Sequence, residues 1–190
     1  MTRFAFGLLV SVFCVELQSA PRLDRLNLLQ FHDATGKVQP VKTANDWQKR
    51  RSAIIKGMES VMGPLPGKDR RVKLDVKVEE EVDTGKYIRQ LITYQSEPDS
   101  RTPAYLCVPK LVFAGKGGKV PAVLCLHPTD NKVGHKVVLG LGGRAGRQYA
   151  VELTDHGYVT ISPAYTHLAN YWPNLGKLCY VSGTMKAIYD

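Results

Sequence analysis

The sequence lacks the features that define several protein classes. Its 190 residues contain no apolar run as long as the roughly eighteen residues that a membrane-spanning helix requires, because the strongest run, Phe4–Val15, is shorter. Only 4 cysteines are present, and they show neither a Cys-x-x-Cys pair nor another metal-ligand spacing. We therefore expect no stable membrane insertion, no disulfide framework, and one domain or at most two.

The N-terminal residues have the pattern of an export signal. Arg3 precedes the apolar run, and small residues follow at Ser19-Ala20, with cleavage expected near Ala20. The pattern predicts that residues 1–20 are a signal peptide and that the protein is secreted or periplasmic. An alternative is that this N-terminal segment is retained and is either buried or anchors the chain. The pattern fits a lipoprotein modified at Cys14 less well.

The chain carries an excess of positive charge. Its 26 basic and 17 acidic residues give a formal net charge of +9. The basic residues are spread from Lys49 to Arg147 without a nucleic-acid recognition motif, so nucleic acid is not an expected partner. This charge leaves open a non-catalytic role in which the chain binds an acidic polymer or surface.

The first third of the chain predicts one helix. Residues 21–45 mix polar and apolar positions and are expected to form an irregular arm. Apolar residues then recur at helical spacing over 46–62, with Asn45 or Asp46 as the N-cap. The run Gly63-Pro64-Leu65-Pro66-Gly67 ends this helix.

The next segment predicts an antiparallel meander. Apolar and charged residues alternate over 72–81, which is typical of a half-buried strand. Further strands are predicted from Tyr87 to Ile92 and from Pro103 to Val108. The turns between them are expected at Asp83-Thr84-Gly85 and Glu97-Pro98-Asp99-Ser100.

The pattern then changes to that of a parallel sheet. Val120–Leu126 and Tyr158–Ile161 are apolar runs of the kind found in strands buried on both faces. Between them lie a glycine-rich loop and a helix from Arg147 to about His156, with Gly157 as its C-cap. This βαβ unit predicts an α/β fold in which the meander leads into a parallel sheet. Ligands of such sheets bind where the parallel strands end, here after Leu126 and Ile161.

The order of several motifs carries more information than each motif alone. These are Pro103–Lys110, the apolar strand before Leu126, His127-Pro128-Thr129-Asp130, Leu139–Gly143, the helix Tyr149–Leu153, His156–Val159, Ser162-Pro163 and Ser182–Ile188. In this order they resemble the α/β-hydrolase superfamily, in particular its secreted esterase branch related to dienelactone hydrolases and acetyl xylan esterases. The resemblance implies that residues 46–190 are part of an α/β-hydrolase domain.

The resemblance also implies a role for the loop after Leu126. In this family a backbone N–H in that loop stabilises the oxyanion that forms during ester hydrolysis. Pro128 has no N–H, so the implied donor is Thr129, with Asp130 as its neighbour. The alternative is that His127-Pro128 is only a turn that ends a strand.

The nucleophile pattern of the family is absent from the sequence. None of the serines lies in a Gly-x-Ser-x-Gly elbow, and the resemblance places the nucleophile, acid and base after the helix that begins near Thr184. We therefore expect the N-terminal portion of a serine hydrolase of carboxylic esters, carbohydrate acetyl esters among them, that is incomplete and C-terminally truncated before the elbow. Such a fragment is expected to be inactive and to aggregate through an unpaired strand edge. The resemblance implies an ester substrate and no cofactor.

Two other sites are considered. Gly140–Ala145 fits a Gly-x-Gly-x-x-Ala dinucleotide fingerprint, but the following strand ends without the acidic residue that would bind a ribose. His127, Asp130 and His135 could ligate a metal from one loop, although their spacing matches no established metal site.

Overall fold

The computed structural model describes residues 21–190, so the predicted signal peptide lies outside the described residues. The chain separates into two compact units, the first ending at Gly57 and the second running from Met58 to Asp190, and each is described by itself. Within residues 21–190, none of the helices is both long and apolar enough to cross a membrane.

The first unit contains a small hairpin where the sequence predicted an irregular arm. β1 (Gln30–His32) pairs antiparallel with β2 (Val38–Pro40). The carboxylate of Asp33 in the turn accepts hydrogen bonds from the Thr35 hydroxyl at 2.7 Å and the Gln39 amide at 2.8 Å. These two bonds hold the pKa of Asp33 well below its ordinary value. Strands of 3 residues are too short to show an alternating pattern, so the sequence did not reveal them.

Helix α1 (Ala44–Met62) confirms the helix predicted over 46–62. Its N-cap is Thr43, however, and not Asn45 or Asp46. The Thr43 hydroxyl accepts a hydrogen bond from the N–H of Asp46 at 3.2 Å, and the Asp46 carboxylate accepts one from the N–H of Thr43 at 3.2 Å. This reciprocal capping box satisfies two donors that a cap at Asp46 would leave free.

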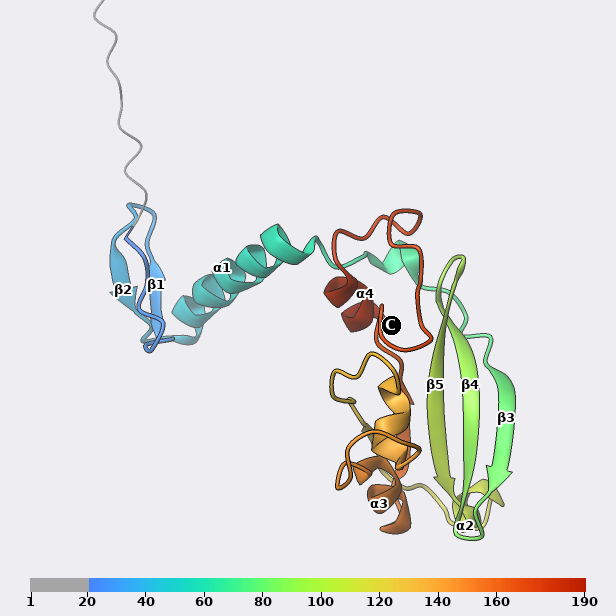
Figure 1. The fold of residues 1–190 in the computed structure, drawn as a ribbon. Helices are drawn as coiled ribbons and strands as arrows, with labels where there is room; N and C mark the ends of the chain where they lie inside the picture. Colours follow the sequence, from blue (N-terminus) through green and yellow to red (C-terminus); the bar gives the residue numbers. More distant parts are fainter. Residues whose placement is uncertain (1–20) are drawn as a thin grey trace, which may run out of the picture. The chain divides into compact units, whose positions relative to one another are not determined.

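The second unit is built on a five-stranded mixed sheet (Figure 1). The strand order is β3-β4-β5-β7-β6, in which β6 and β7 are parallel and the other neighbours antiparallel. The predicted meander and the parallel βαβ unit are therefore both confirmed. The strands are β3 (Lys77–Asp83), β4 (Tyr87–Glu97), β5 (Ser100–Pro109), β6 (Ala122–Leu124) and β7 (Val159–Pro163).

The first strand of the sheet differs from the prediction. A half-buried strand was expected over 72–81, but β3 begins at Lys77, and most of its side chains are exposed. The reason is its position at the sheet edge, where it pairs only with β4 and is interrupted by a bulge between Val78 and Glu80. The alternating apolar residues before it are also exposed; these are Val72, Leu74 and Val76.

The strand predicted over Val120–Leu126 is shorter and more exposed than expected. Within residues 21–190, β6 pairs with β7 alone, and Leu124 and Leu126 are 58% and 55% exposed. The prediction of burial on both faces is therefore wrong for β6, because β6 is the last strand of this sheet. The inner strand β7 meets it only in part: Thr160 and Ser162 on one face are each 1% exposed, whereas the side chains on its other face are partly exposed.

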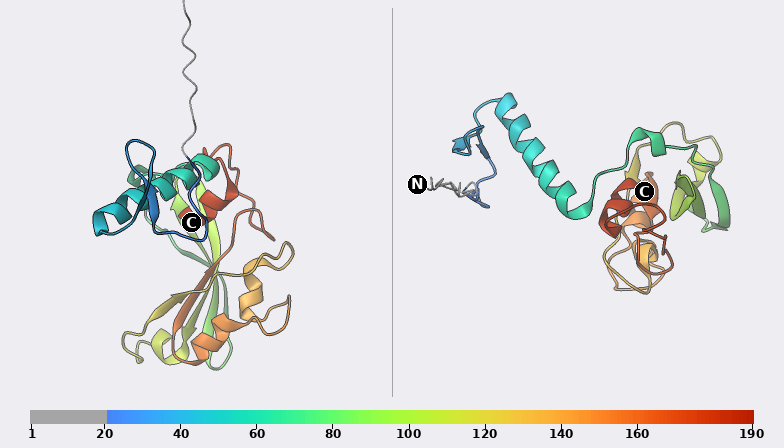
Figure 2. Two further views of the ribbon diagram at one scale, coloured as in Figure 1. Left: turned by 90° about the vertical axis from the view of Figure 1, so that its left-hand side faces the viewer. Right: turned by 90° about the horizontal axis from the view of Figure 1, so that it is seen from above.

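Helix α3 (Tyr149–Asp155) and the 3-10 segment η2 (Gly134–Leu139) cover one face of the sheet (Figure 2). Cys107 and Cys125 lie in the core cluster beneath them. Burial raises the pKa of the Cys107 thiol to about 11, so this cysteine is a core residue and not a reactive thiol. A short helix, α2 (Lys110–Phe113), follows β5.

The last helix, α4 (Gly183–Tyr189), begins where the sequence predicted. The Ser182 hydroxyl caps it by accepting a hydrogen bond from the N–H of Met185 at 3.2 Å. The same hydroxyl donates to the carbonyl of Met62 at 2.9 Å. Ser182 therefore has a structural role at the start of the helix.

A buried ion cluster joins α4 to the sheet. The side chains of Glu97 and Lys186 are both 0% exposed, with Lys186 Nζ 3.0 Å from Glu97 Oε1. Arg70, in η1 (Lys68–Arg70), reaches the other oxygen of Glu97 at 2.5 Å, and Asp190 pairs with Lys186. The cluster thus contains two positive and two negative side chains, so each buried charge has a partner of opposite sign, as buried charges require.

The Lys186→Met variant tests this cluster. Removing the ammonium leaves Glu97 buried with Arg70 as its remaining cation, so we expect the free energy of unfolding to fall by about 3–5 kcal/mol. Urea denaturation followed by circular dichroism measures this change. Lys116→Met, at an exposed loop position, is the control and should change stability by less than about 0.5 kcal/mol. Equal effects of the two substitutions would contradict the role of the cluster.

The exposed edge of β6 predicts self-association. We expect sedimentation velocity to show larger species as the concentration of the chain rises, because an apolar strand edge pairs readily with another chain. Leu124→Lys should shift the distribution toward monomer. Leu111→Lys replaces a leucine that is 68% exposed and lies outside the sheet, and it should leave the distribution unchanged. A monomeric wild-type chain at all concentrations would refute this prediction.

Candidate functional site

The loops that follow β6 and β7 meet at one edge of the sheet, as the sequence predicted. Leu124 and Ile161 are partners in the parallel pairing, so both strands end side by side. Beyond them the rings of His127 and Tyr165 stack with centroids 4.0 Å apart. The backbone N–H of Tyr165 donates to Nε2 of His127 at 3.2 Å, which ties the two loops together.

His127 is held as a neutral ring. Its Nε2 accepts a hydrogen bond, so the proton lies on Nδ1, which is 2.9 Å from the carbonyl oxygen of Pro128. The side chain is 4% exposed, and burial lowers its pKa. Both ring nitrogens are used in positioning, so His127 fixes the start of the loop that contains Thr129.

Thr129 lines a cavity at this edge of the sheet. The residue is exposed, and within residues 21–190 its backbone N–H donates to no acceptor. The cavity has a volume of about 560 Å³ and opens between the loops and α4. Its other lining residues are mostly apolar; they are Leu124, Leu126, Tyr165, Thr166, Leu168, Gly183, Thr184, Ala187 and Ile188.

Asp130 shapes the turn that follows. One oxygen of its carboxylate accepts hydrogen bonds from the N–H of Val133 at 2.8 Å and of Lys132 at 2.9 Å. These bonds lower the pKa of Asp130. The glycine-rich loop passes close by, since a Cβ on Gly143 would lie 3.6 Å from the other carboxylate oxygen. Asp130 therefore positions the backbone next to Thr129.

His135 lies beneath this loop without a hydrogen-bond partner. The side chain is 1% exposed, and neither ring nitrogen finds a partner within residues 21–190. Its ring packs at 5.0 Å from Tyr105 and 6.2 Å from His127. Burial, followed by the proximity of His127, lowers the pKa of His135 to about 4. Its ring is therefore neutral at pH 7.

The geometry does not support the two rival sites. In the described part of the chain, no three His, Cys, Asp or Glu side chains gather as metal ligands, and His127 and Asp130 are already engaged. The glycines from Gly140 to Gly143 follow η2, whereas a dinucleotide fingerprint requires a strand immediately before them.

The two serines that follow the first parallel strand have structural positions. Ser162 is buried within β7, and Ser182 caps α4. Neither lies on a strand-to-helix elbow of the kind that exposes a nucleophile.

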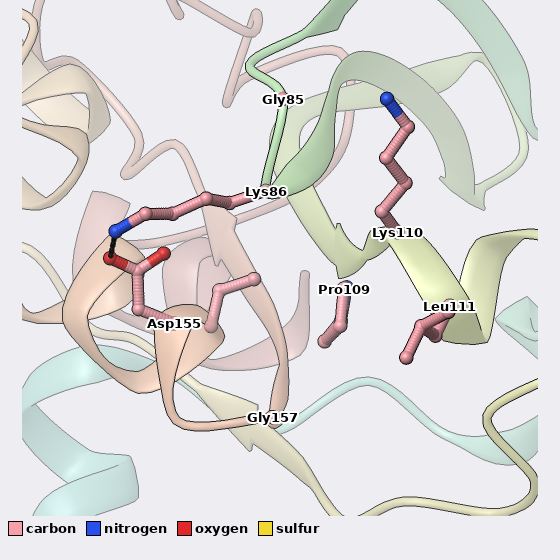
Figure 3. Close-up of a pocket in the computed structure, with 8 residues that line it drawn as sticks. Gly85, Lys86, Pro109, Lys110, Leu111, Asp155 and Gly157 are labelled. Carbon is pink, nitrogen blue, oxygen red and sulfur yellow. Dashed lines mark hydrogen bonds and ion pairs between the residues drawn. The ribbon is translucent and has the colours of Figure 1, made fainter.

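A second cavity, of about 480 Å³, lies at the opposite end of the sheet (Figure 3). Lys86 and Asp155 form an ion pair of 3.1 Å across it. Both partners are partly or largely exposed, so the pair contributes little to stability. The cavity lies away from the carboxyl ends of the parallel strands, where ligands of such sheets bind.

The sequence did not reveal the aromatic residues around the site. Tyr165 lies in the loop predicted to be important, but its stacking on His127 depends on strand pairing. His167 and Trp172 form another stacked pair in the following loop, with ring centroids 4.9 Å apart. The signal available in the sequence was a histidine and a tryptophan within one short segment after the second parallel strand.

The fold is similar to solved esterase structures. A Bacteroides fragilis NCTC 9343 protein that carries the name acetyl xylan esterase matches 78% of this chain, with a TM-score of 0.54 and 14% identity. The glucuronoyl esterase from Solibacter usitatus matches 77%, with a TM-score of 0.49 and 22% identity. A promiscuous CE15 esterase from a marine bacterial metagenome matches 84%, with a TM-score of 0.43 and 15% identity. The chain spans 42%, 42% and 46% of the lengths of these proteins, respectively.

These matches concern the fold. A scan of the sequence against protein-family models matches none, and a search of the curated proteins finds no match. The match with a TM-score of 0.54 shows that the mixed sheet and its helices are arranged as in part of that solved structure. The structural resemblance predicted from the order of the motifs is confirmed.

The low pKa of buried His135 leads to a prediction for how stability depends on pH. Below pH 6.5 the unfolded chain binds a proton that folded His135, with a pKa of about 4, does not bind. The free energy of unfolding should therefore fall as the pH drops from 6.5 to 4, by up to roughly 3 kcal/mol. Denaturation at a series of pH values measures this fall.

His135→Leu should reduce this dependence, since leucine has no proton to bind and no hydrogen bond is lost. The contribution of His127, whose pKa burial also lowers, should remain. His156→Leu, at an exposed position, is the control and should retain the fall in stability. The same pH profile in the wild-type and His135→Leu chains would contradict the prediction.

Proposed function

We propose that this chain forms the oxyanion-binding part of a serine hydrolase of carboxylic esters, with the α/β-hydrolase fold. The observation that carries the proposal is the free backbone N–H of Thr129, at the carboxyl end of β6 and beside an apolar cavity. The esterase structures that share this fold support the same class of reaction.

The chemistry requires such a donor. When a hydroxyl adds to an ester carbonyl, negative charge develops on the carbonyl oxygen, and a fixed N–H stabilises it without reorganisation. Removing one donor of this kind typically slows a reaction by about 10²–10³-fold. In the proposed mechanism the Thr129 N–H binds this oxygen while an alkoxide leaves and an acyl-enzyme forms, which water then hydrolyses.

The neighbours of Thr129 keep its backbone in place. Pro128 has a restricted φ, and its carbonyl is bound by the neutral ring of His127. On the other side, Asp130 fixes the turn through two backbone N–H groups. The N–H of Thr129 is thereby left between two anchored residues.

The attacking serine is not assigned to this chain. None of the serines here lies in a Gly-x-Ser-x-Gly elbow, so the nucleophile, its base and its acid belong in this proposal to a part of the protein outside residues 21–190. We accordingly predict that the 190-residue chain alone does not hydrolyse p-nitrophenyl acetate above the rate in buffer. Turnover that persists in repurified chain would contradict this assignment.

The proposed substrates are esters of carbohydrates. The name of the fold relative that matches with a TM-score of 0.54, acetyl xylan esterase, supports this class. Such substrates are large extracellular polymers, and the predicted signal peptide over residues 1–20 agrees with a secreted or periplasmic location.

Two variants test the donor directly. Acetate, the product carboxylate, should shift the amide resonance of Thr129 in ¹⁵N–¹H spectra of the 190-residue chain, because the free N–H binds an oxygen anion. Thr129→Pro removes the N–H and should abolish the effect of acetate on neighbouring resonances. Thr129→Ala keeps the N–H and should respond like the wild type.

An unmoved Thr129 resonance at saturating acetate would overturn the proposal. In that case, binding of heparin with an affinity that falls steeply with salt would favour the basic binding role that the net charge of +9 leaves open.

A further inference from the structure

An aromatic pair, of which the tryptophan is exposed, lies in the loop between β7 and α4. The side chain of Trp172 is 68% exposed, although indole is among the most apolar groups of proteins. Its ring stacks on the imidazole of His167 with an angle of 17° between the planes. The stack gives the loop a flat aromatic surface.

The pair is held rigidly. The indole Nε1 donates to the carbonyl of Ala169 at 2.8 Å, so the ring cannot rotate freely. The N–H of His167 donates to the carbonyl of Tyr171 at 2.8 Å. Tyr171 is buried, and its hydroxyl donates to Asp190, a member of the buried ion cluster. A rigid ring loses little conformational entropy when a ligand binds.

The backbone of this loop adopts costly conformations. His167 and Ala169 have φ values of +62° and +48°, in the left-handed region that residues with a Cβ rarely adopt. Such conformations persist where the surrounding contacts impose them, and they are concentrated at binding sites. Here they turn the two rings toward each other.

The pair adjoins the cavity that Thr129 lines. A Cβ on Gly183, which lines that cavity, would lie 3.9 Å from Nδ1 of His167. A Cβ on Gly134 would lie 2.8 Å from the side chain of Ala169, whose carbonyl holds the indole. Gly134 in turn donates its N–H to the carbonyl of Asp130 at 3.1 Å. The aromatic surface is therefore at the rim of the candidate site.

We propose that Trp172 and His167 form a stacking platform for a sugar ring of the substrate. A pyranose presents a face of C–H groups that packs on an aromatic ring. The inference rests on the proposed function, because the platform would hold the sugar that carries the ester bound near Thr129. It adds a binding role that does not itself require catalysis.

The test is the binding of a neutral sugar. Xylotetraose should change the intrinsic tryptophan fluorescence of the 190-residue chain in a saturable manner, and calorimetry gives the affinity. Trp172→Ala should weaken binding by about tenfold, whereas Trp172→Phe, which keeps an aromatic face, should stay within about threefold of the wild type. Trp47→Ala removes the other tryptophan, which is 40% exposed on α1, and should leave the affinity unchanged.

The platform is overturned if saturating xylotetraose leaves the fluorescence unchanged, or if Trp172→Ala, folded by circular dichroism, binds as tightly as the wild type. Because no ester is cleaved, this outcome is separate from the Thr129 test. Sugar binding that depends on Trp172, with a Thr129 resonance that acetate does not move, would support the platform and overturn the proposed esterase function.

Discussion

The parallel pairing of β6 with β7 is the constraint on which the candidate site depends. It brings the ends of two strands together although a loop, η2 and α3 separate them in sequence. The contact between His127 and Tyr165 is possible only because these strands end at the same edge. The crossover segments α3 and η2 cover one face of the sheet and bury the cysteines beneath them. The same strand pairing therefore creates both the core beneath these segments and the candidate site.

The site combines two neutral imidazoles with one carboxylate that fixed dipoles stabilise. His127 and His135 are uncharged at neutral pH because burial lowers their pKa values. The carboxylate of Asp130 stays charged, since the backbone N–H groups of Val133 and Lys132 lower its pKa, and these bonds direct one of its oxygens into its own turn. The charges that the second unit does bury, those of Glu97 and Lys186, compensate each other away from Thr129. This separation leaves a site suited to binding an oxygen whose charge appears only during reaction.

The parts that could be predicted are those whose type follows from local pattern. β4, β7 and α3 have the expected type, although the most buried side chains of β7 are those of Thr160 and Ser162, which the apolar pattern did not single out. β6 was expected to be buried because apolar runs usually are, but its exposure depends on whether another strand lies beside it. Thr129 could be singled out from the motif order and the missing N–H of Pro128. The contact between His127 and Tyr165 could not be predicted, because Tyr165 follows a strand that is distant in sequence.

The sequence by itself determined the class of fold, because hydrophobic periods of two and of about 3.6 residues are local properties of the chain. It also determined that Thr129, and not Pro128, can donate a hydrogen bond, since that follows from covalent structure. Only the tertiary structure decided which residues meet: Tyr165 on His127, Lys186 beside Glu97, and Trp172 near the cavity. Contacts between distant segments depend on strand order and packing, which local sequence does not encode.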